Sequence, residues 1–598
     1  MTRAWRAAAQ PVSARLSLLT AIVCVSAAVT AGCATVPASG PPRPIGESPN
    51  ELTQGEDFPQ LIPAPPGDQW TPNQIVSGFL AASASFAGTV AREYLVPRAR
   101  TWKPGWAVTV VSQPTFKPAI FRPRLAGQSA NKTATVEVSG QELATLTASG
   151  QYQIPPVSAR QRINFNLKRL DGQWRITNPP ARLLLSKSDF LRVYQPRNLY
   201  FLAPSGRTLV PDPVFVPLAA TTTDLATGLV NALEQQPFGY LQGVTETSFP
   251  RGTRLLGQVR IAGSGAIVNL GGAIARASPS VLANAAAQLV WTLTSPSYGR
   301  SAIRSVRLEI NGQDRPLPRS PGGTELLGTY QSMVPVPPAR TGLYFIGSKG
   351  AVQVLSASQV TARPAAAHGQ AGTGLVPMAT IAVSPPDERF IAGISPDGEV
   401  VHYGPLEGDA TLGSWRPGGR STSLSWDRNG DLWVATTKGV WLRPPGGKPI
   451  AVDVRLRGGE RITALRLAPD GIRVAMIVRS GRVSQVQIGA VARGSGTAAI
   501  GQLVPIGPGI TNAAALSWYD PDNLIVLADP GTAGARLYRV PVNGGQPTLI
   551  APEQRIVSFA TAGTQIVAGL RSGRMVTFTG SPAGWGPLLP GRYPAYPG

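Results

Sequence analysis

The sequence predicts a multidomain chain in which two α+β domains precede an all-β propeller, expected to have six blades. Three observations lead to this prediction. The 598 residues are 43% hydrophobic and 15% charged, which supplies apolar material for several cores and argues against general disorder. The 66 glycines and 58 prolines favour turns and short strands over helical bundles. Helical periodicity occurs only before residue 334, and short apolar strands separated by turns fill the remainder.

Residues 1–32 are expected to be a lipoprotein signal peptide. Arginines precede an apolar run at 16–29, which is too short to span a membrane but has the length of a signal-peptide core. Small residues ending in Gly32 then precede Cys33, an arrangement that resembles a bacterial lipobox. We therefore expect cleavage between Gly32 and Cys33, and S-diacylglycerol and N-palmitoyl attachment at Cys33. The alternative is a simple secretory signal followed by an incidental cysteine.

The cysteine count agrees with lipid attachment. Of the two cysteines, Cys24 lies in the apolar run and would be removed, so Cys33 is the only thiol of the mature chain and no intramolecular disulfide can form. Residues 33–66 are expected to form a tether, because nine prolines and few large apolar residues favour an extended, semi-rigid segment. Such a tether would hold the folded domains away from a bilayer.

Residues 67–197 are predicted to form the first α+β domain. Thr71-Pro72 begins a helix, and Asp171-Gly172 predicts a hairpin between alternating strands. One long helix followed by an antiparallel sheet is similar in layout to cystatin-like or nuclear-transport-factor-like folds. The helix is expected to continue to a stop at Pro97, through apolar residues at helical spacing: Ile75, Phe79, Phe86, Val90 and Tyr94.

Residues 198–333 are predicted to form the second α+β domain. Ser278-Pro279 begins one of its two helices, and its last strand is expected to end at Asn311-Gly312. The other helix stops at Pro237 and carries three leucines on one face: Leu225, Leu229 and Leu233.

Residues 334–598 are predicted to form the propeller, because a turn followed by an apolar strand that ends in a small residue recurs along this segment. The spacings between the recurring residues are 45, 43, 40, 52 and 41, and periods near 40–45 are typical of propeller blades. Six blades are expected, with five or seven as alternatives. The recurring residues are Gly347, Ala392, Ala435, Ala475, Leu527 and Ala568.

The sequence contains few residues that could carry catalysis. Only two histidines occur, and His368 and His402 are expected on a surface loop and a strand face. Segment 427–431 resembles a calcium loop only faintly and is expected to be a hairpin turn. No phosphate-binding loop or nucleophile elbow occurs. We therefore predict no enzyme activity, no catalytic residue, no metal and no cofactor; paired carboxylates on propeller loops are the alternative.

The charge distribution favours an anionic partner. The formal net charge is +23, and residues 67–200 contain 17 basic and 6 acidic side chains. Nucleic acid is a poor partner for an exported chain, whereas anionic lipid headgroups or cell-wall polymers fit. The alternative is a solvated surface that reflects compositional bias.

Several segments together resemble the LpqB family of actinobacterial lipoproteins. They are the lipobox with residues 33–37, the α+β domain, the propeller with its ending at 594–598, and a middle domain that resembles the GerMN module of spore-germination proteins. The GerMN resemblance rests on segments 209–211, 249–253, 266–270 and 288–293, although Asn269 stands where these modules usually have aspartate.

This resemblance implies a lipid-anchored, extracytoplasmic accessory protein of the MtrAB two-component system. It implies the sensor kinase MtrB as partner, and an influence on cell-envelope homeostasis and cell division. The alternative function is a propeller protein that binds or hydrolyses cell-wall glycans.

Overall fold

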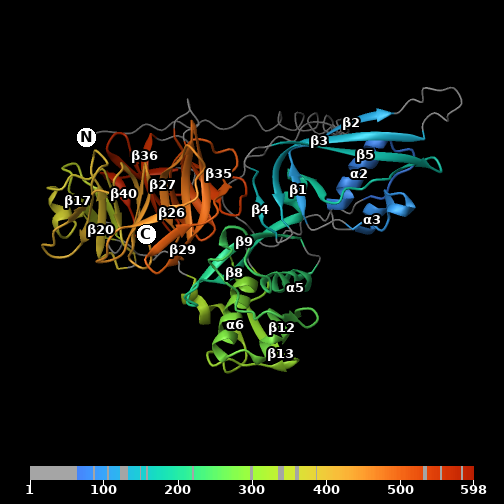
Figure 1. Ribbon diagram of the computed structural model, residues 1–598, viewed down its shortest axis with the longest axis horizontal. Coiled ribbons are helices and arrows are strands. Elements are labelled where there is room, and N and C mark those ends of the chain that lie inside the picture. Colours follow the sequence, from blue (N-terminus) through green and yellow to red (C-terminus); the bar gives the residue numbers. More distant parts are fainter. Residues whose placement is uncertain are drawn as a thin grey trace, which may run out of the picture. The chain divides into compact units, whose positions relative to one another are not determined.

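The computed structural model describes residues 64–598 with short gaps, and Figure 1 shows its elements. The predicted signal peptide, Cys33 and tether residues 34–63 lie outside the described residues. The described residues form two regions of mixed helix and sheet and then a propeller, so the predicted fold class is confirmed. The gaps are 85–87, 104–106, 121–131, 148–149, 156–158, 219–220, 297–300, 335–341, 357–362, 386, 529–534, 552–554 and 581–583.

The first region is a sheet covered on one face by helix α2 (Pro72–Ala84) (Figure 1). Alternate residues of β3 and β5, such as Val136 and Phe165, pack against Phe79 of α2. The strand order is β6-β5-β3-β1-β7, with β2 and β4 paired to β3. The remaining elements are β1 (Val108–Val111), β2 (Thr115–Ile120), β3 (Thr133–Leu146), β4 (Tyr152–Gln153), β5 (Arg160–Leu170), β6 (Gln173–Ile176), β7 (Leu183–Ser186) and α4 (Lys187–Val193).

Helix α2 and helix α3 (Gly88–Glu93) make up the described part of the predicted first helix. Residues 85–87, which include Phe86, lie between them and outside the described residues. Helix α3 ends at Glu93, four residues before the predicted stop at Pro97.

A hairpin of β8 (Tyr194–Leu202) and β9 (Leu209–Pro217) leads into the second region. Its sheet has the order β10-β12-β13-β14, with β11 beside β12 and β15 beside β13. Strands β12 and β13 are parallel because helix α6 crosses between them. The elements are α5 (Thr222–Leu233), β10 (Thr253–Leu255), β11 (Arg260–Ala262), β12 (Gly265–Gly272), α6 (Pro279–Thr294), β13 (Ser305–Ile310), β14 (Gln313–Asp314) and β15 (Glu325–Leu326).

Most predicted landmarks of this region are confirmed, but helix α5 ends at Leu233, four residues before the predicted stop at Pro237. Helix α5 buries Leu229 and Leu233, and the Ser278 side chain caps α6 by accepting from the backbone of Val281 at 3.4 Å. Asn311 and Gly312 both have positive φ and join β13 to β14.

The remaining described strands form six propeller blades, as predicted. The blades are numbered 1 to 6 along the chain. Strand β30 joins blades 3 and 4, because it pairs with both β26 and β29. The blades consist of β16 (Leu343–Ile346), β17 (Val352–Leu355), β18 (Ala365–Ala366) and β40 (Arg592–Ala595); β19 (Thr380–Val383), β20 (Phe390–Ile394), β21 (Val401–Pro405) and β22 (Gly413–Trp415); β23 (Ser421–Trp426), β24 (Leu432–Thr436), β25 (Gly439–Arg443) and β26 (Ile450–Val454); β27 (Glu460–Leu467), β28 (Arg473–Ser480), β29 (Val483–Gly494), β30 (Thr497–Ile500) and β31 (Val504–Ile506); β32 (Ala513–Asp520), β33 (Asn523–Ala528), β34 (Arg536–Pro541) and β35 (Thr548–Ala551); and β36 (Ile556–Ala562), β37 (Gln565–Leu570), β38 (Arg574–Phe578) and β39 (Trp585–Pro590).

The sequence repeat corresponds to one position in each blade. The recurring residues lie on, or directly after, the second strand from the channel: β16, β20, β24, β28, β33 and β37. The innermost strands contact one another in sequence order, and β40 contacts both β36 and β19. Strand β40 also pairs with β16, where Ala595 lies opposite Tyr344. The last strand therefore completes blade 1 and closes the ring.

Candidate functional site at the propeller channel

The inner strands enclose a channel with a cavity of about 470 Å³, a volume typical of small-molecule sites. Among the described residues that line it there are two arginines, Arg428 and Arg466, but no Asp, Glu, Lys or His side chain. Segment 593–598 forms part of the wall. Hydroxyl groups are frequent in the lining: Thr380, Thr422, Ser423, Thr463, Ser517, Ser558 and Thr561.

Two tryptophans fix the wall of the channel. The indole nitrogen of Trp426 on β23 donates to the Ala382 carbonyl at 3.1 Å, and that of Trp518 on β32 donates to the Arg466 carbonyl at 3.2 Å. Both acceptors belong to the inner strand of the preceding blade. Each buried indole therefore fastens one blade to its neighbour.

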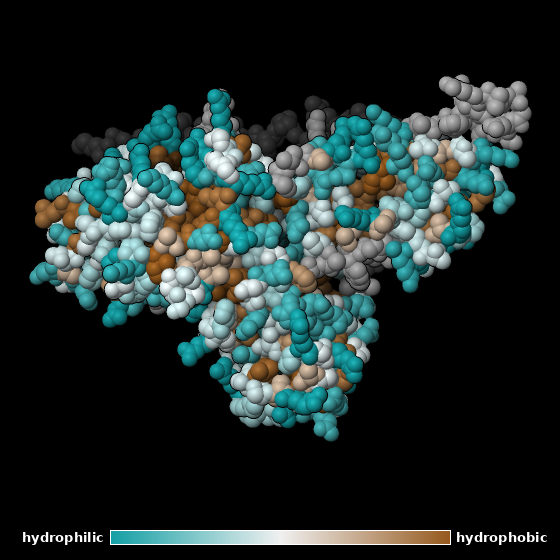
Figure 2. Space-filling view, in the orientation of Figure 1, coloured by the Kyte–Doolittle hydropathy of each residue, from teal (hydrophilic) through white to brown (hydrophobic). Residues whose placement is uncertain are grey.

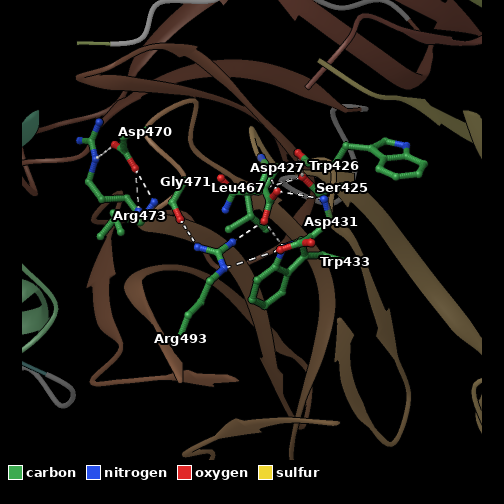
Figure 3. A network of polar contacts seen from close by, with 12 residues as sticks. Ser425, Trp426, Asp427, Asp431, Trp433, Leu467, Asp470, Gly471, Arg473 and Arg493 are labelled. Carbon is green, nitrogen blue, oxygen red and sulfur yellow. Dashed lines mark hydrogen bonds and ion pairs between the residues drawn. The ribbon is translucent and has the colours of Figure 1, made fainter. Parts of the chain in front are cut away.

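Blades 3 and 4 are also joined by a network around Asp427, which follows β23 directly (Figure 3). One carboxylate oxygen accepts from the backbone nitrogens of Asn429 and Asp431 at 2.8 and 3.1 Å. The other accepts from the Trp433 indole at 2.9 Å and from Arg493 of β29. Asp427 is therefore a buried turn cap whose acceptor positions are occupied.

A second buried ion pair lies in the next turn, between β27 and β28 (Figure 3). The Asp470 carboxylate is 2.7 Å from Nε of Arg473, and the two side chains are only 3% and 1% exposed. Arg473 also donates to the Pro521 carbonyl at 2.7 Å and lies over the Trp518 ring. Burial opposes the charge of Arg473, but Asp470 outweighs burial and raises the pKa of the guanidinium.

The carboxylates of this network are poorly suited to catalysis. Burial, and secondarily the Asp427 charge, raise the pKa of Asp431 to about 6 against the opposing effect of Arg493. Asp431 nevertheless lies 3.8 Å from Nε of Arg493, and Asp427 is fully hydrogen-bonded. The described residues contain no group of three or more His, Cys, Asp or Glu that could hold a metal.

The hairpin β8–β9 packs against this end of the propeller. Asn198 of β8 donates to Asp522 at 2.6 Å, and Arg428 donates to the Thr208 hydroxyl. A shared apolar cluster includes Val210 and Tyr240 together with propeller residues. The hairpin thus links the second α+β region to the propeller through polar and apolar contacts.

Asp212 of β9 is a fully buried carboxyl group at this junction. Gln151 of the first region donates weakly to both of its oxygens, at 3.5 Å. Burial raises the pKa of Asp212 to about 7, while Gln151 and Arg473 act in the opposite direction. No sequence pattern marked this residue, since its surroundings come from three parts of the chain.

The structure describes most of the residues singled out in the sequence, but not the predicted lipid site. Gly32 and Cys33 lie outside the described residues, as does Cys24. His368 is exposed in the loop after β18, as predicted. His402 lies on strand β21, also as predicted, and its Nδ1 atom is 3.1 Å from the Ser414 hydroxyl. Burial lowers the pKa of His402.

Two further motifs have structural roles. Segment 427–431 is a hairpin turn between β23 and β24, as predicted. The Asn269 side-chain oxygen accepts from the backbone of Gly312 at 2.9 Å and so holds the turn after β13. An amide oxygen can do this as well as a carboxylate, so asparagine is compatible with the fold at this position.

The first region presents a basic sheet face. In β5, the residues that alternate with buried Phe165 and Leu167 are exposed, and the neighbouring strands continue this face. Figure 2 shows hydrophilic residues over β2 and the adjoining part of β3. Glu137 is the only carboxylate that the register places among the paired β2–β3–β5 residues of this face. Its exposed cations are Lys117, Arg160, Arg162 and Lys168, none of which forms an ion pair in the described chain.

Comparison with known proteins decides the family. The models for the lipoprotein LpqB N-terminal domain, the sporulation and spore germination domain, and the lipoprotein LpqB beta-propeller domain match residues 65–191, 198–316 and 353–597. The lipoprotein LpqB of Thermobifida fusca is 31% identical and covers 98% of this chain and 99% of its own length. The chain belongs to the LpqB lipoprotein family. The predicted family resemblance is thereby confirmed.

Other LpqB lipoproteins show the same extent of similarity. That of Streptomyces avermitilis is 31% identical over 97% of this chain and 98% of its own length. That of Mycobacterium bovis strain BCG is 27% identical over 98% of this chain and 100% of its own length. The similarity to these LpqB relatives therefore extends over nearly the whole chain.

Solved structures resemble single parts of this LpqB family member. TolB from Acinetobacter baumannii has a TM-score of 0.33 and 15% identity, covering 43% of this chain and 66% of its own. The tandem GerMN domains of GerM from Bacillus subtilis have a TM-score of 0.17 and 22% identity, covering 21% and 41%. Within the part of the chain that the structure describes, no helix has the length and hydropathy needed to cross a bilayer.

Proposed function

We propose that this chain is a lipid-anchored accessory protein on the extracytoplasmic face of the cell membrane. In this proposal it binds the external domain of a sensor kinase, MtrB or its equivalent, without catalysing a reaction, and thereby influences cell-envelope homeostasis and division. The observation that carries the proposal is membership of the LpqB lipoprotein family over nearly the full chain. The occupied carboxylates around Asp427 and Asp470 support a binding role rather than a catalytic one.

The anchor in this proposal is Cys33. The apolar run before it is too short to span a membrane, and small residues precede the cysteine as in a lipobox. A thioether-linked diacylglycerol with an additional N-acyl chain gives stable attachment, whereas one acyl chain does not. Cys33→Ala should release the chain from membranes, as measured by fractionation and by loss of metabolically incorporated lipid. Full membrane retention of the variant without lipid would contradict this assignment.

The partner is tested most directly in intact cells. Cross-linking followed by purification of the chain should recover the sensor kinase, and the purified kinase ectodomain should bind the soluble chain at low salt. Confinement to the membrane surface raises the effective concentration of the two proteins, so a modest affinity in solution is compatible with the proposal. If the ectodomain does not bind, but cell-wall fragments bind saturably or are hydrolysed, the glycan function replaces the kinase function.

A further inference from the structure

Arg466 is a charged residue in the wall of the propeller channel, on inner strand β27. Three acceptors surround its Nη1 atom. This nitrogen donates to the Ser423 hydroxyl at 2.7 Å and to the carbonyls of Leu424 and Leu465 at 2.8 Å each. The contacts to Ser423 and Leu424 of β23 fasten blade 4 to blade 3, and all three contacts use one nitrogen of the guanidinium.

The other edge of the Arg466 guanidinium is free. Its Nε and Nη2 atoms have no acceptor among the described residues. Neither nitrogen is among the buried polar atoms of the described chain that lack a partner, so neither is buried. Both atoms therefore face accessible space, and because Arg466 lines the channel, that space is the channel. The Nε–Nη2 edge is the planar fork that binds a carboxylate or phosphate through two parallel hydrogen bonds.

The electrostatic surroundings favour an anion at this edge. No carboxylate side chain is among the described channel-lining residues, and Arg466 forms no ion pair in the described chain. Burial lowers the pKa of Arg466 to about 10, since no acidic partner offsets the loss of hydration. A desolvated cation without a counter-ion is unfavourable, so an entering anion would gain more here than at a surface arginine.

We propose that the propeller channel binds a small organic anion whose carboxylate or phosphate pairs with the free edge of Arg466. The cavity of about 470 Å³ leaves room for the remainder of such a molecule. Hydroxyls of the lining, such as that of Thr463, can accept hydrogen bonds from its polar part. This site does not depend on whether a sensor kinase is the protein partner.

Calorimetric titration of the full acylated chain in detergent micelles tests the site. The probes are glucose 6-phosphate, citrate, inorganic phosphate and glucose, at constant ionic strength. Saturable binding of glucose 6-phosphate or citrate is expected, and the tighter of the two identifies the phosphate or the carboxylate class. Glucose should not bind. Arg466→Gln should weaken binding at least tenfold, Arg466→Lys should retain part of it, and Arg571→Gln, which changes an exposed arginine of blade 6, should leave it unchanged.

A second measurement uses the unmodified protein and does not depend on the folding of a variant. Phenylglyoxal reacts with accessible guanidinium groups, and mass spectrometry reports the modified fraction at each arginine. Glucose 6-phosphate or citrate should slow the modification of Arg466 but not of Arg571, and glucose should have no effect. The proposal is overturned if no anionic probe binds, if binding is equally tight in Arg466→Gln, or if Arg466 is not protected.

Discussion

At the residue scale, buried polar side chains join segments that are far apart in the sequence. Asp427 pairs with Arg493, Asn198 donates to Asp522, and the Trp518 indole reaches the Arg466 carbonyl. Each contact satisfies a polar group that would be costly to bury alone. The orientation of neighbouring blades is therefore set by hydrogen bonds as well as by apolar packing.

Asp470 should be among the least tolerant residues of the propeller. Asp470→Ala leaves Arg473 charged and buried, and it removes the acceptor of two backbone nitrogens in the turn. Breaking one side of such a pair costs roughly 3–5 kcal/mol of unfolding free energy. The exposed pair Arg416–Glu399 provides the control, because Glu399→Gln should change stability by about 1 kcal/mol or less. Denaturant unfolding measures both variants, and equal effects would contradict the assignment.

Asp212 should make stability depend on pH in an unusual direction. Its pKa is raised from 3.8 to about 7 in the folded chain, so folding favours the protonated form. The contribution of the Asp212 carboxyl to the free energy of unfolding is fully present below about pH 4 and is lost as the pH rises toward 7. The facing groups are Gln151, Tyr240 and Arg473.

Asp212→Asn tests this dependence, because the amide does not titrate. The variant should gain stability relative to the parent chain as the pH rises from 4 to 7.5, as measured by thermal unfolding at each pH. Exposed Asp409 serves as the control, since Asp409→Asn should follow the parent profile. A constant difference between Asp212→Asn and the parent across this range would rule out the proposed titration.

The sequence predicted local polar features of the site but not its long-range ones. Asp171-Gly172 and Asn311-Gly312 are turn signals whose chemistry is complete within a few residues, and both form the expected hairpins. The free edge of Arg466 depends on where Ser423 of another blade lies. The burial of Asp212 likewise depends on the packing of three segments, which no local pattern encodes.

At the element scale, the propeller repeat was predictable because each blade buries its second strand. Four of the six recurring residues, Ala392, Ala435, Ala475 and Ala568, are fully buried, which favours small side chains at these positions, although β33 has Leu527 there. The closure by β40 was not predictable, since β40 pairs with β16 from the other end of the propeller.

Strand β40 should control the closure of the ring. Ala595 lies in an apolar cluster with Tyr344, Ile381 and Val383. Ala595→Asp places a carboxylate in that cluster and should destabilise the propeller by several kcal/mol. Arg592→Gln changes an exposed residue of the same strand and should have an effect within about 0.5 kcal/mol. Limited proteolysis should reveal cleavage near β16 and β40 in Ala595→Asp alone; equal resistance of both variants would show that β40 is dispensable.

At the scale of the whole molecule, charge is distributed unevenly between the segments. The basic face of the first region carries Lys117, Arg160, Arg162 and Lys168, and this region directly follows the proposed tether. In the proposed function these cations face either the kinase ectodomain or the anionic surface of the membrane and cell wall. Attraction between exposed charges weakens as salt is added, because the screening length falls to about 8 Å at physiological ionic strength.

Replacing these four cations by glutamine should therefore slow association with the kinase ectodomain and remove most of its salt dependence, since charges at the rim of an interface act chiefly on the association rate. The matched control replaces four exposed propeller cations, Lys448, Arg455, Arg457 and Arg461, by glutamine. Both variants lose the same formal charge, so a difference between them reports position rather than net charge. Surface plasmon resonance at low and physiological salt measures the rates, and co-sedimentation with anionic vesicles measures membrane attraction separately. If the two quadruple variants behave alike in both measurements, the basic face is only a solvated surface, and the excess charge reflects composition.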